Sequence, residues 1–171
     1  MPLEKQEELC SELQRLISLL GMKNGVFNIE ARLGVDGKVY IMEVSPRGGG
    51  NRLSEVLKMA TGVDLIKNSV RACVGLPVEE VEQLPYNGAW AIIMLHSDEN
   101  GIFSGVEYAP EIVDNVVDAD LLVRPGDPIS AFKGANDAIG HVIMNADSPD
   151  KIRYVIENSS CLIRVTRKQH A

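Results

Sequence analysis

Residues 25–51 of this 171-residue chain read GVFNIEARLGVDGKVYIMEVSPRGGGN, and this stretch decides the fold. Residues 26–33 alternate between apolar and polar side chains, which is the two-residue period of a half-buried strand. A second strand is predicted over 38–45, because Asp36 and Gly37 between the two runs are a strong signal for a two-residue hairpin turn. The stretch therefore predicts an antiparallel hairpin that leads into a glycine-rich loop.

The hairpin register brings acidic side chains together. With a two-residue turn, Glu30 lies directly opposite Glu43, and Asn28 lies opposite Ser45. Opposed Cβ atoms on one face of a hairpin are about 4.5–5.5 Å apart, so two carboxylates placed there repel each other. A divalent cation removes this repulsion, because hard cations such as Mg²⁺ take oxygen ligands. The register favours a metal site made by Glu30, Glu43 and Ser45; the alternative is a solvated polar face on an ordinary hairpin.

The loop after the hairpin adds the features of a phosphate site. Arg47 lies four residues after Glu43, and an arginine can contact a phosphate with two hydrogen bonds. The glycines that follow allow the backbone to approach an anion closely, and the start of the next helix adds a partial positive charge. We therefore predict Arg47 as a catalytic residue, and Arg47, Gly48, Gly49 and Asn51 as the residues that bind the cofactor phosphates.

These motifs resemble the metal-binding end of ATP-grasp enzymes, among them biotin carboxylase, carbamoyl phosphate synthetase and the D-alanine and L-amino-acid ligases. The family pattern is an acid or Gln on one strand and Glu-x-Asn-x-Arg on the next. Glu30 matches the first acid, and Glu43 matches the glutamate that typically bridges two Mg²⁺ ions. Arg47 matches the arginine near the transferring phosphate. Ser45 stands where most members have Asn, as it does in formate-dependent glycinamide ribonucleotide transformylase.

The resemblance continues along the chain and implies the fold. Residues 60–65, Ala-Thr-Gly-Val-Asp-Leu, recur in this family before a helix, and residues 86–166 are similar to the strand-rich carboxyl-terminal domain of the carboxylase and amino-acid-ligase branches. We expect an α+β fold. Residues 1–75 form the carboxyl-terminal half of an ATP-grasp subdomain, an antiparallel hairpin plus helices, and residues 76–171 form a small strand-rich carboxyl-terminal domain.

Local signals place the remaining elements. Asp64 and Ser148 are expected to cap the amino ends of helices, with Pro149 at the first helical position. Apolar periodicity and turn residues predict helices over 3–20, 53–60, 64–74 and from 148, and strands over 89–96 and near 102–108, 115–124, 129–133, 139–145 and 161–166.

The resemblance also implies a function. It implies an ATP-dependent carboxylate–amine or carboxylate–thiol ligase that acts through an acyl phosphate, with ATP and Mg²⁺ or Mn²⁺ as cofactors and a small carboxylate and an amine as substrates. The chain shows neither the two lysines that hold the ATP phosphates nor the glycine-rich lid of this family. It is therefore expected to be a carboxyl-terminal fragment or one half of a split enzyme, inactive alone, with a homodimer mate or a companion amino-terminal half as partner.

The composition argues against several other classes of protein. The net charge is −7, from 24 acidic and 17 basic residues, which argues against a nucleic-acid or anionic-membrane surface. The only basic run, over 164–168, is interpreted as a solvated tail. No apolar run is long enough to span a bilayer. Cys10, Cys73 and Cys161 form no disulfide framework or zinc motif, and we expect buried free thiols in a cytoplasmic protein.

Two alternatives to the ligase interpretation stay open. The first is a non-catalytic assembly or binding module derived from an ATP-grasp domain, with the hairpin as a relic; the retained Glu30, Glu43 and Arg47 argue against it. The second is a phosphoribosylamine–glycine ligase branch of the same superfamily, whose metal loop usually continues differently after the arginine.

Overall fold

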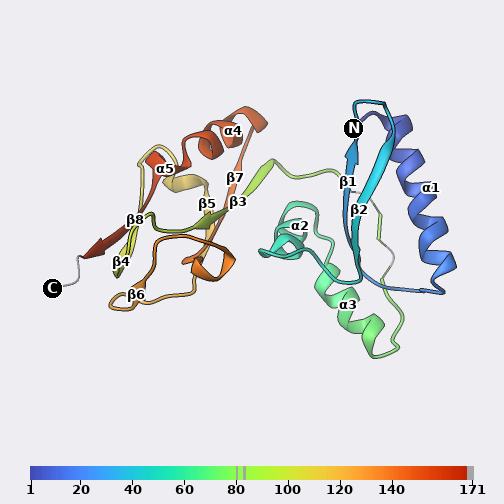
Figure 1. The fold of residues 1–171 in the computed structure, drawn as a ribbon, viewed down its shortest axis with the longest axis horizontal. Coiled ribbons are helices and arrows are strands. Elements are labelled where there is room, and N and C mark those ends of the chain that lie inside the picture. The colour runs from blue at the N-terminus through green and yellow to red at the C-terminus, as the bar shows by residue number, and fades with distance from the viewer. Residues whose placement is uncertain (80, 83, 169–171) are drawn as a thin grey trace. The chain divides into compact units, whose positions relative to one another are not determined.

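The computed structural model describes residues 1–79, 81–82 and 84–168, and these form an α+β fold, as predicted. The chain divides into two compact units, Met1–Leu84 (unit 1) and Pro85–Ala171 (unit 2). Figure 1 shows helices and a hairpin in unit 1, and mainly strands in unit 2. The domain identities assigned to residues 1–75 and 76–171 stay a prediction.

Unit 1 is a hairpin accompanied by three helices. Two of its helix boundaries fall where the sequence provides caps. α2 ends before Gly62, which has a φ of 83°. α3 begins after Asp64, whose side chain accepts a hydrogen bond of 2.8 Å from the Lys67 N–H. The elements in order are α1 (Leu3–Leu19), β1 (Asn28–Leu33), β2 (Val39–Ser45), α2 (Leu53–Thr61) and α3 (Leu65–Cys73).

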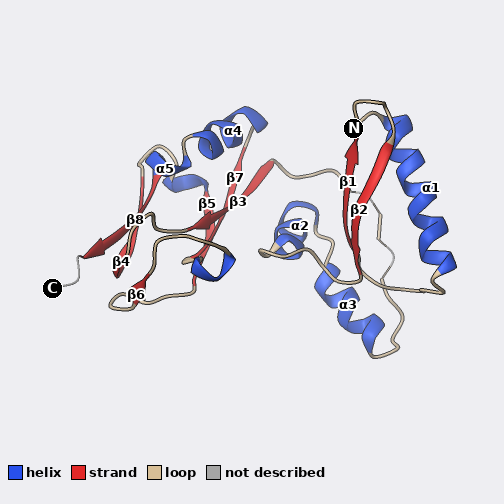
Figure 2. Cartoon of the chain, viewed as in Figure 1, coloured by secondary structure: helices blue, strands red, loops and turns tan. Residues whose placement is uncertain are grey.

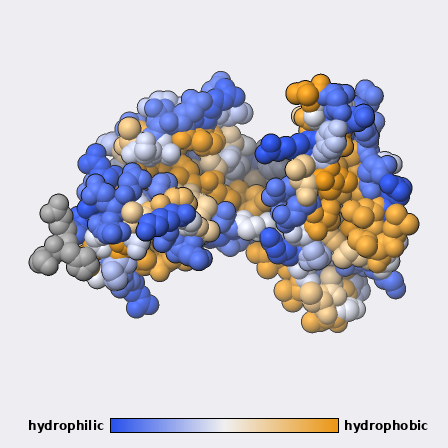
Figure 3. Space-filling model, viewed as in Figure 1, coloured by the Kyte–Doolittle hydropathy of each residue, from blue (hydrophilic) through white to orange (hydrophobic). Residues whose placement is uncertain are grey.

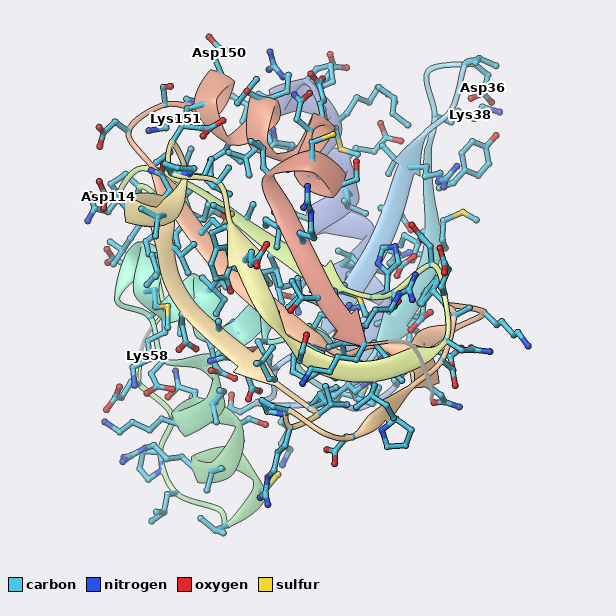
Figure 4. All side chains as sticks on the ribbon, turned by 90° about the vertical axis from the view of Figure 1, so that its left-hand side faces the viewer. Asp36, Lys38, Lys58, Asp114, Asp150 and Lys151 are labelled. Atoms are coloured by element: carbon cyan, nitrogen blue, oxygen red, sulfur yellow. The ribbon has the colours of Figure 1, made fainter. Side chains whose placement is uncertain are left out.

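The hairpin closes with a three-residue loop, so the predicted two-residue turn is wrong. The Gly34 N–H donates to the Lys38 carbonyl at 2.9 Å, which leaves Val35, Asp36 and Gly37 in the loop (Figure 4 labels Asp36 and Lys38). Gly37 has a φ of 73°. The third residue of such a loop adopts this left-handed conformation, which glycine favours because it has no Cβ.

A β-bulge corrects the shift in register that the longer loop causes. Ala31 lies opposite Ile41, one residue away from the predicted pairing. Glu30 nevertheless lies opposite Glu43, because Met42 is an extra residue in β2 at this point. The predicted pairing of the two glutamates is therefore confirmed, although the turn from which it was predicted is wrong.

Unit 2 contains two antiparallel three-stranded sheets, in the orders β3-β7-β5 and β6-β4-β8, with α4 packed on β3 and β7 (Figure 2). As predicted, α4 begins at Pro149 with Ser148 as its cap. The elements are β3 (Ala89–Leu95), β4 (Gly101–Tyr108), a 3-10 turn (Val113–Asn115), β5 (Val116–Leu121), β6 (Pro128–Ile129), a 3-10 turn (Ala135–Asp137), β7 (Gly140–Ala146), α4 (Pro149–Glu157), α5 (Ser159–Leu162) and β8 (Ile163–Lys168).

Three predictions are corrected by this fold. The strand expected near 129–133 is reduced to β6, which begins at Pro128. The basic run over 164–168 is not a solvated tail but most of β8, because Ile163 and Val165 alternate with its cations and pack toward the core. The strand predicted over 161–166 is thus confirmed with shifted bounds. The cysteines are free but exposed, because all three lie on outward sides of helices: Cys10, Cys73 and Cys161.

Among the residues that the structure describes, no helix has both the length and the apolar character needed to cross a bilayer.

The core of unit 2 gives a test of the fold. Phe103 on β4 is 1% exposed, so replacing it with Ala should leave a cavity and destabilise unit 2 by about 3–5 kcal/mol. Phe132 is 46% exposed, and Phe132→Ala should cost less than about 1 kcal/mol. Urea unfolding measures both free energies; equal losses for the two variants would contradict the burial described.

Candidate functional site

The candidate site lies on the polar face of the hairpin, at its end nearest the glycine-rich loop. Glu30 is opposite Glu43 and Asn28 is opposite Ser45, and residues two apart along a strand point to the same side. The two glutamates are exposed, whereas Asn28 and Ser45 are half-buried. The hairpin therefore brings together all three residues predicted as metal ligands, with Asn28 beside them.

A hydrogen bond within β2 orients one of the carboxylates. The Ser45 Oγ donates to Glu43 Oε1 at 2.5 Å. A hydroxyl that donates to a carboxylate keeps its own oxygen lone pairs available, so Ser45 can hold Glu43 in place and still offer an oxygen to a cation.

The donor set fits a hard divalent cation. Glu30, Glu43 and Ser45 offer only oxygen atoms, which suit Mg²⁺ or Mn²⁺ better than softer metals. In the part of the chain that the structure describes, no group of three or more His, Cys, Asp or Glu side chains could hold a metal ion. Two carboxylates and a hydroxyl leave coordination positions for phosphate oxygens and water, which is how Mg²⁺ is bound at nucleotide sites.

The glycine-rich loop is held between the hairpin and α2. A Cβ on Gly49 would lie 2.6 Å from Leu53 Cδ2 and 3.2 Å from Asn28 Oδ1. A Cβ on Gly48 would lie 2.7 Å from Ser54 Oγ. A side chain at either position would require Leu53 or Ser54 to shift, so the loop backbone lies close to α2 and to the polar end of β1.

Arg47 contacts the loop that it begins. Its Nη1 donates to the Gly48 carbonyl at 2.9 Å, and its backbone N–H donates to the Ser45 carbonyl at 2.8 Å. The guanidinium therefore lies along its own loop. This contact uses one of its five N–H groups, so the others remain able to donate to a phosphate.

The start of α2 contains two consecutive non-glycine residues with a left-handed backbone. Asn51 has a φ of 52° and Arg52 a φ of 62°. Asparagine tolerates this conformation, whereas it is costly for arginine, and such strain is concentrated at functional sites. The Arg52 guanidinium binds the Glu55 carboxylate through Nε at 3.0 Å and Nη2 at 2.6 Å, which holds this backbone in place.

Sequence reasoning missed the supporting residues around the loop. Ser54 is 9% exposed behind Gly48, and Arg52 fixes the start of α2. Ser54 carried a weak signal, because a serine among the apolar residues of a short helix indicates a specific polar contact. Arg52 carried no such signal, because an arginine in the sequence does not indicate a backbone with positive φ.

Comparison with known proteins found similarity in both units of the chain. Residues 93–167 match the family described as L-amino acid ligase C-terminal domain 2. An uncharacterized protein of Sinorhizobium fredii, y4rH, is 31% identical over 157 residues, which are 91% of this chain and 32% of that protein. The chain thus spans about a third of the length of this curated relative.

Two solved structures are similar over nearly the whole chain. The L-amino acid ligase from Bacillus licheniformis has a TM-score of 0.78 at 17% identity, and the match covers 99% of this chain and 42% of that one. The phosphoribosylglycinamide synthetase from Anaerococcus prevotii has a TM-score of 0.76 at 22% identity, with 98% and 43% covered. The resemblance inferred from the hairpin motifs is confirmed: this chain has the fold of the carboxyl-terminal part of an ATP-grasp ligase.

Proposed function

We propose that this chain supplies the Mg²⁺- and phosphate-binding hairpin of an ATP-dependent ligase that joins a carboxylate to an amine. The observation that carries the proposal is the opposition of Glu30 and Glu43, with Ser45 bonded to Glu43 and the glycine-rich loop directly beyond. A solvated hairpin face gains nothing from two opposed carboxylates, whereas a cation makes their proximity favourable.

The proposed reaction has two steps. A carboxylate oxygen of the substrate attacks the γ-phosphorus of ATP, and ADP leaves. The amine nitrogen then attacks the acyl carbon, phosphate leaves and the nitrogen loses a proton; a thiol would react in the same way. When bound, Mg²⁺ or Mn²⁺ neutralises the phosphate charge that opposes the first step.

Each site residue has a role in this proposal. Glu30 and Glu43 hold the cations, and Ser45 orients Glu43. The remaining N–H groups of Arg47 bind the transferred phosphoryl group and stabilise the charge that develops there. The backbone N–H groups of Gly48, Gly49 and Asn51, at the start of α2, bind phosphate oxygens.

The family match in unit 2 favours amino acids as the substrate class, because that family is named for L-amino acid ligases. The phosphoribosylamine–glycine ligase branch is supported only by a shared fold. A requirement for ATP and three free thiols support a cytoplasmic location. We assign no role in binding nucleic acid or membranes, consistent with the net charge of −7.

The isolated chain provides a direct test of the cation site. Mn²⁺ should broaden the backbone NMR signals of Glu30, Glu43 and Ser45 at millimolar concentrations, because a paramagnetic ion relaxes nearby nuclei. Glu43→Gln should weaken this effect at least about tenfold, since one of two carboxylate ligands is lost. Glu107→Gln, which changes an exposed strand glutamate of unit 2, is the matched control and should leave the broadening unchanged. Strongest broadening elsewhere in the chain would disprove the assignment.

In a longer protein that contains an ATP-binding part, Glu43→Gln should lower ATP turnover at least about 100-fold, because the cation that offsets the phosphate charge is no longer held correctly. Nucleotide-dependent ligation is measured by ADP release with amino-acid substrates. Turnover equal to that of the unchanged protein would exclude a catalytic hairpin and favour the assembly-module alternative.

The loop offers an independent test. Gly49→Ala should displace the loop, because the new methyl group would lie 3.1 Å from Leu53 Cβ and 3.2 Å from Asn28 Oδ1 even after the end of the Leu53 side chain, at 2.6 Å, has moved aside. In the same longer protein, the KM for ATP should rise about tenfold, as expected when phosphate-binding N–H groups are displaced. Gly50→Ala is the matched control, because a Cβ there meets nothing within 4 Å. Equal KM values for the two variants would show that the loop does not bind the nucleotide.

A further inference from the structure

Unit 2 contains a cavity that the candidate site does not use. It has a volume of about 270 Å³ and lies among residues of β3, of the segment that follows β3, and of α5 and β8. Pockets for drug-sized ligands span about 300–1,000 Å³, so a cavity of this size suits a smaller molecule. All of its lining residues lie in unit 2, whereas Glu30, Glu43 and the glycine-rich loop lie in unit 1. The cavity is therefore a separate candidate binding site.

Two open strand edges border this cavity. Among the described strands, β3 pairs only with β7, and β8 pairs only with β4. Three consecutive residues of each strand line the cavity, 93–95 on β3 and 163–165 on β8. Successive side chains of a strand point to opposite faces, so three in a row line one cavity only where the edge of the strand faces it. Backbone N–H and C=O groups of both strands are therefore available to a ligand that has an amide group of its own.

The charged side chains of the lining balance each other in sign. Two are arginines, Arg164 and Arg167, and two are acids, Asp98 and Glu99. A ligand that is only an anion would be attracted by the arginines and repelled by the acids, and a cation would meet the reverse. A ligand with one charge of each sign is attracted by both kinds of side chain.

Arg167 occupies an inward-facing position on β8. It lies opposite Phe103, a core residue that is 1% exposed, and the Arg167 side chain itself is 24% exposed. An ion pair with Glu99 holds the guanidinium in place. A guanidinium has five N–H groups, so others remain able to donate to a carboxylate of a ligand. Arg167 is therefore a half-buried and oriented donor for an anionic group.

The apolar part of the lining offers a place for an aliphatic side chain. Leu95 and Ile163 belong to the core of unit 2, Ile93 and Val165 pack against it, and all four line the cavity. On the face drawn in Figure 3, unit 2 displays mainly hydrophilic residues with smaller apolar groups between them. Burial of an aliphatic ligand side chain against these four residues would be favourable.

We propose that this cavity binds a dipeptide with free termini and an aliphatic side chain. The dipeptide carboxylate accepts hydrogen bonds from Arg167, and its ammonium group binds Asp98. Its amide pairs with the strand edges, and its side chain contacts Leu95 and Val165. Joining the carboxylate of one amino acid to the amine of another gives a ligand of this class, but the inference rests on the lining of the cavity and not on the proposed function.

Titration of the whole chain with L-alanyl-L-leucine tests this site. Backbone NMR signals should shift in a saturable way, most strongly over residues 93–99 and 163–167. Amidation of the dipeptide carboxylate should weaken binding at least about tenfold, because a charge-assisted hydrogen bond to a half-buried arginine is lost. N-acetylation should weaken it about threefold, since the Asp98 side chain is 96% exposed and exposed ion pairs are weak. Free leucine, which has both charges but no amide, should bind at least about tenfold more weakly.

Two variants assign the charges of the ligand to their partners. Arg167→Gln should weaken binding of the dipeptide at least about tenfold and leave binding of its amidated form unchanged, because that form has no carboxylate. Asp98→Asn should weaken binding of the dipeptide about threefold and leave the N-acetylated form unchanged. Since Asp98 is almost fully exposed, its variant folds even if Arg167→Gln does not. Arg153→Gln is the matched control with no expected effect, because Arg153 also pairs with an acid, Asp150, but lies on α4 outside the lining.

Other outcomes overturn the inference. Equal weakening of all forms of the dipeptide by Arg167→Gln would mean that this arginine only closes the end of the core. Absence of saturable shifts, or shifts that are strongest in unit 1, would remove the cavity as a dipeptide site. Free leucine bound as tightly as the dipeptide would show that the strand edges do not contact the ligand. Glu43→Gln should leave dipeptide binding unchanged, so a failure of the proposed function is distinguishable from a failure of this site.

Discussion

The electrostatic repulsion between Glu30 and Glu43 is the constraint on which the candidate site depends. Opposed carboxylates on a hairpin face destabilise it unless a cation or a hydrogen-bond donor lies between them. Ser45 reduces this cost in part, because its hydroxyl donates to Glu43. No comparable donor to Glu30 comes from the opposing strand position, which is Glu43 itself. We therefore expect the hairpin to be more favourable with a cation bound than without one, which is what a metal site requires of its scaffold.

The backbone maintains this arrangement through two irregularities that compensate for each other. The three-residue loop that ends with Gly37 shifts the register by one residue, and the bulge at Met42 shifts it back. Loss of either feature alone would turn one glutamate to the opposite face of the hairpin, because side chains alternate along a strand. The bulge lies directly beside Glu43, and bulges are frequent next to active sites because they redirect a side chain.

Sequence reasoning could therefore reach the correct pairing of Glu30 with Glu43 through an incorrect turn. Alternation over 26–33 and the caps at Asp64 and Ser148 are local signals, and each predicted its element. Loop length and bulge position depend on how the strands pack, and the apolar periodicity of the sequence carries no information about that packing. The closing strand was predicted over 161–166, but its basic carboxyl end was interpreted as a solvated tail, because the cations there alternate with side chains that find a core only in the folded chain.

The weak core of unit 1 and the location of the metal hairpin are connected. A site proposed to hold phosphates and cations needs a rigid support, yet among the described strands the hairpin pairs with no other and has few buried neighbours. Arg47 donates a hydrogen bond to the Gly48 carbonyl, and the backbone at Gly48 and Gly49 lies close to Ser54 and Asn28. The candidate ligands are therefore held by few contacts within unit 1, and a cation that joins Glu30 to Glu43 across the two strands would itself fix their orientation.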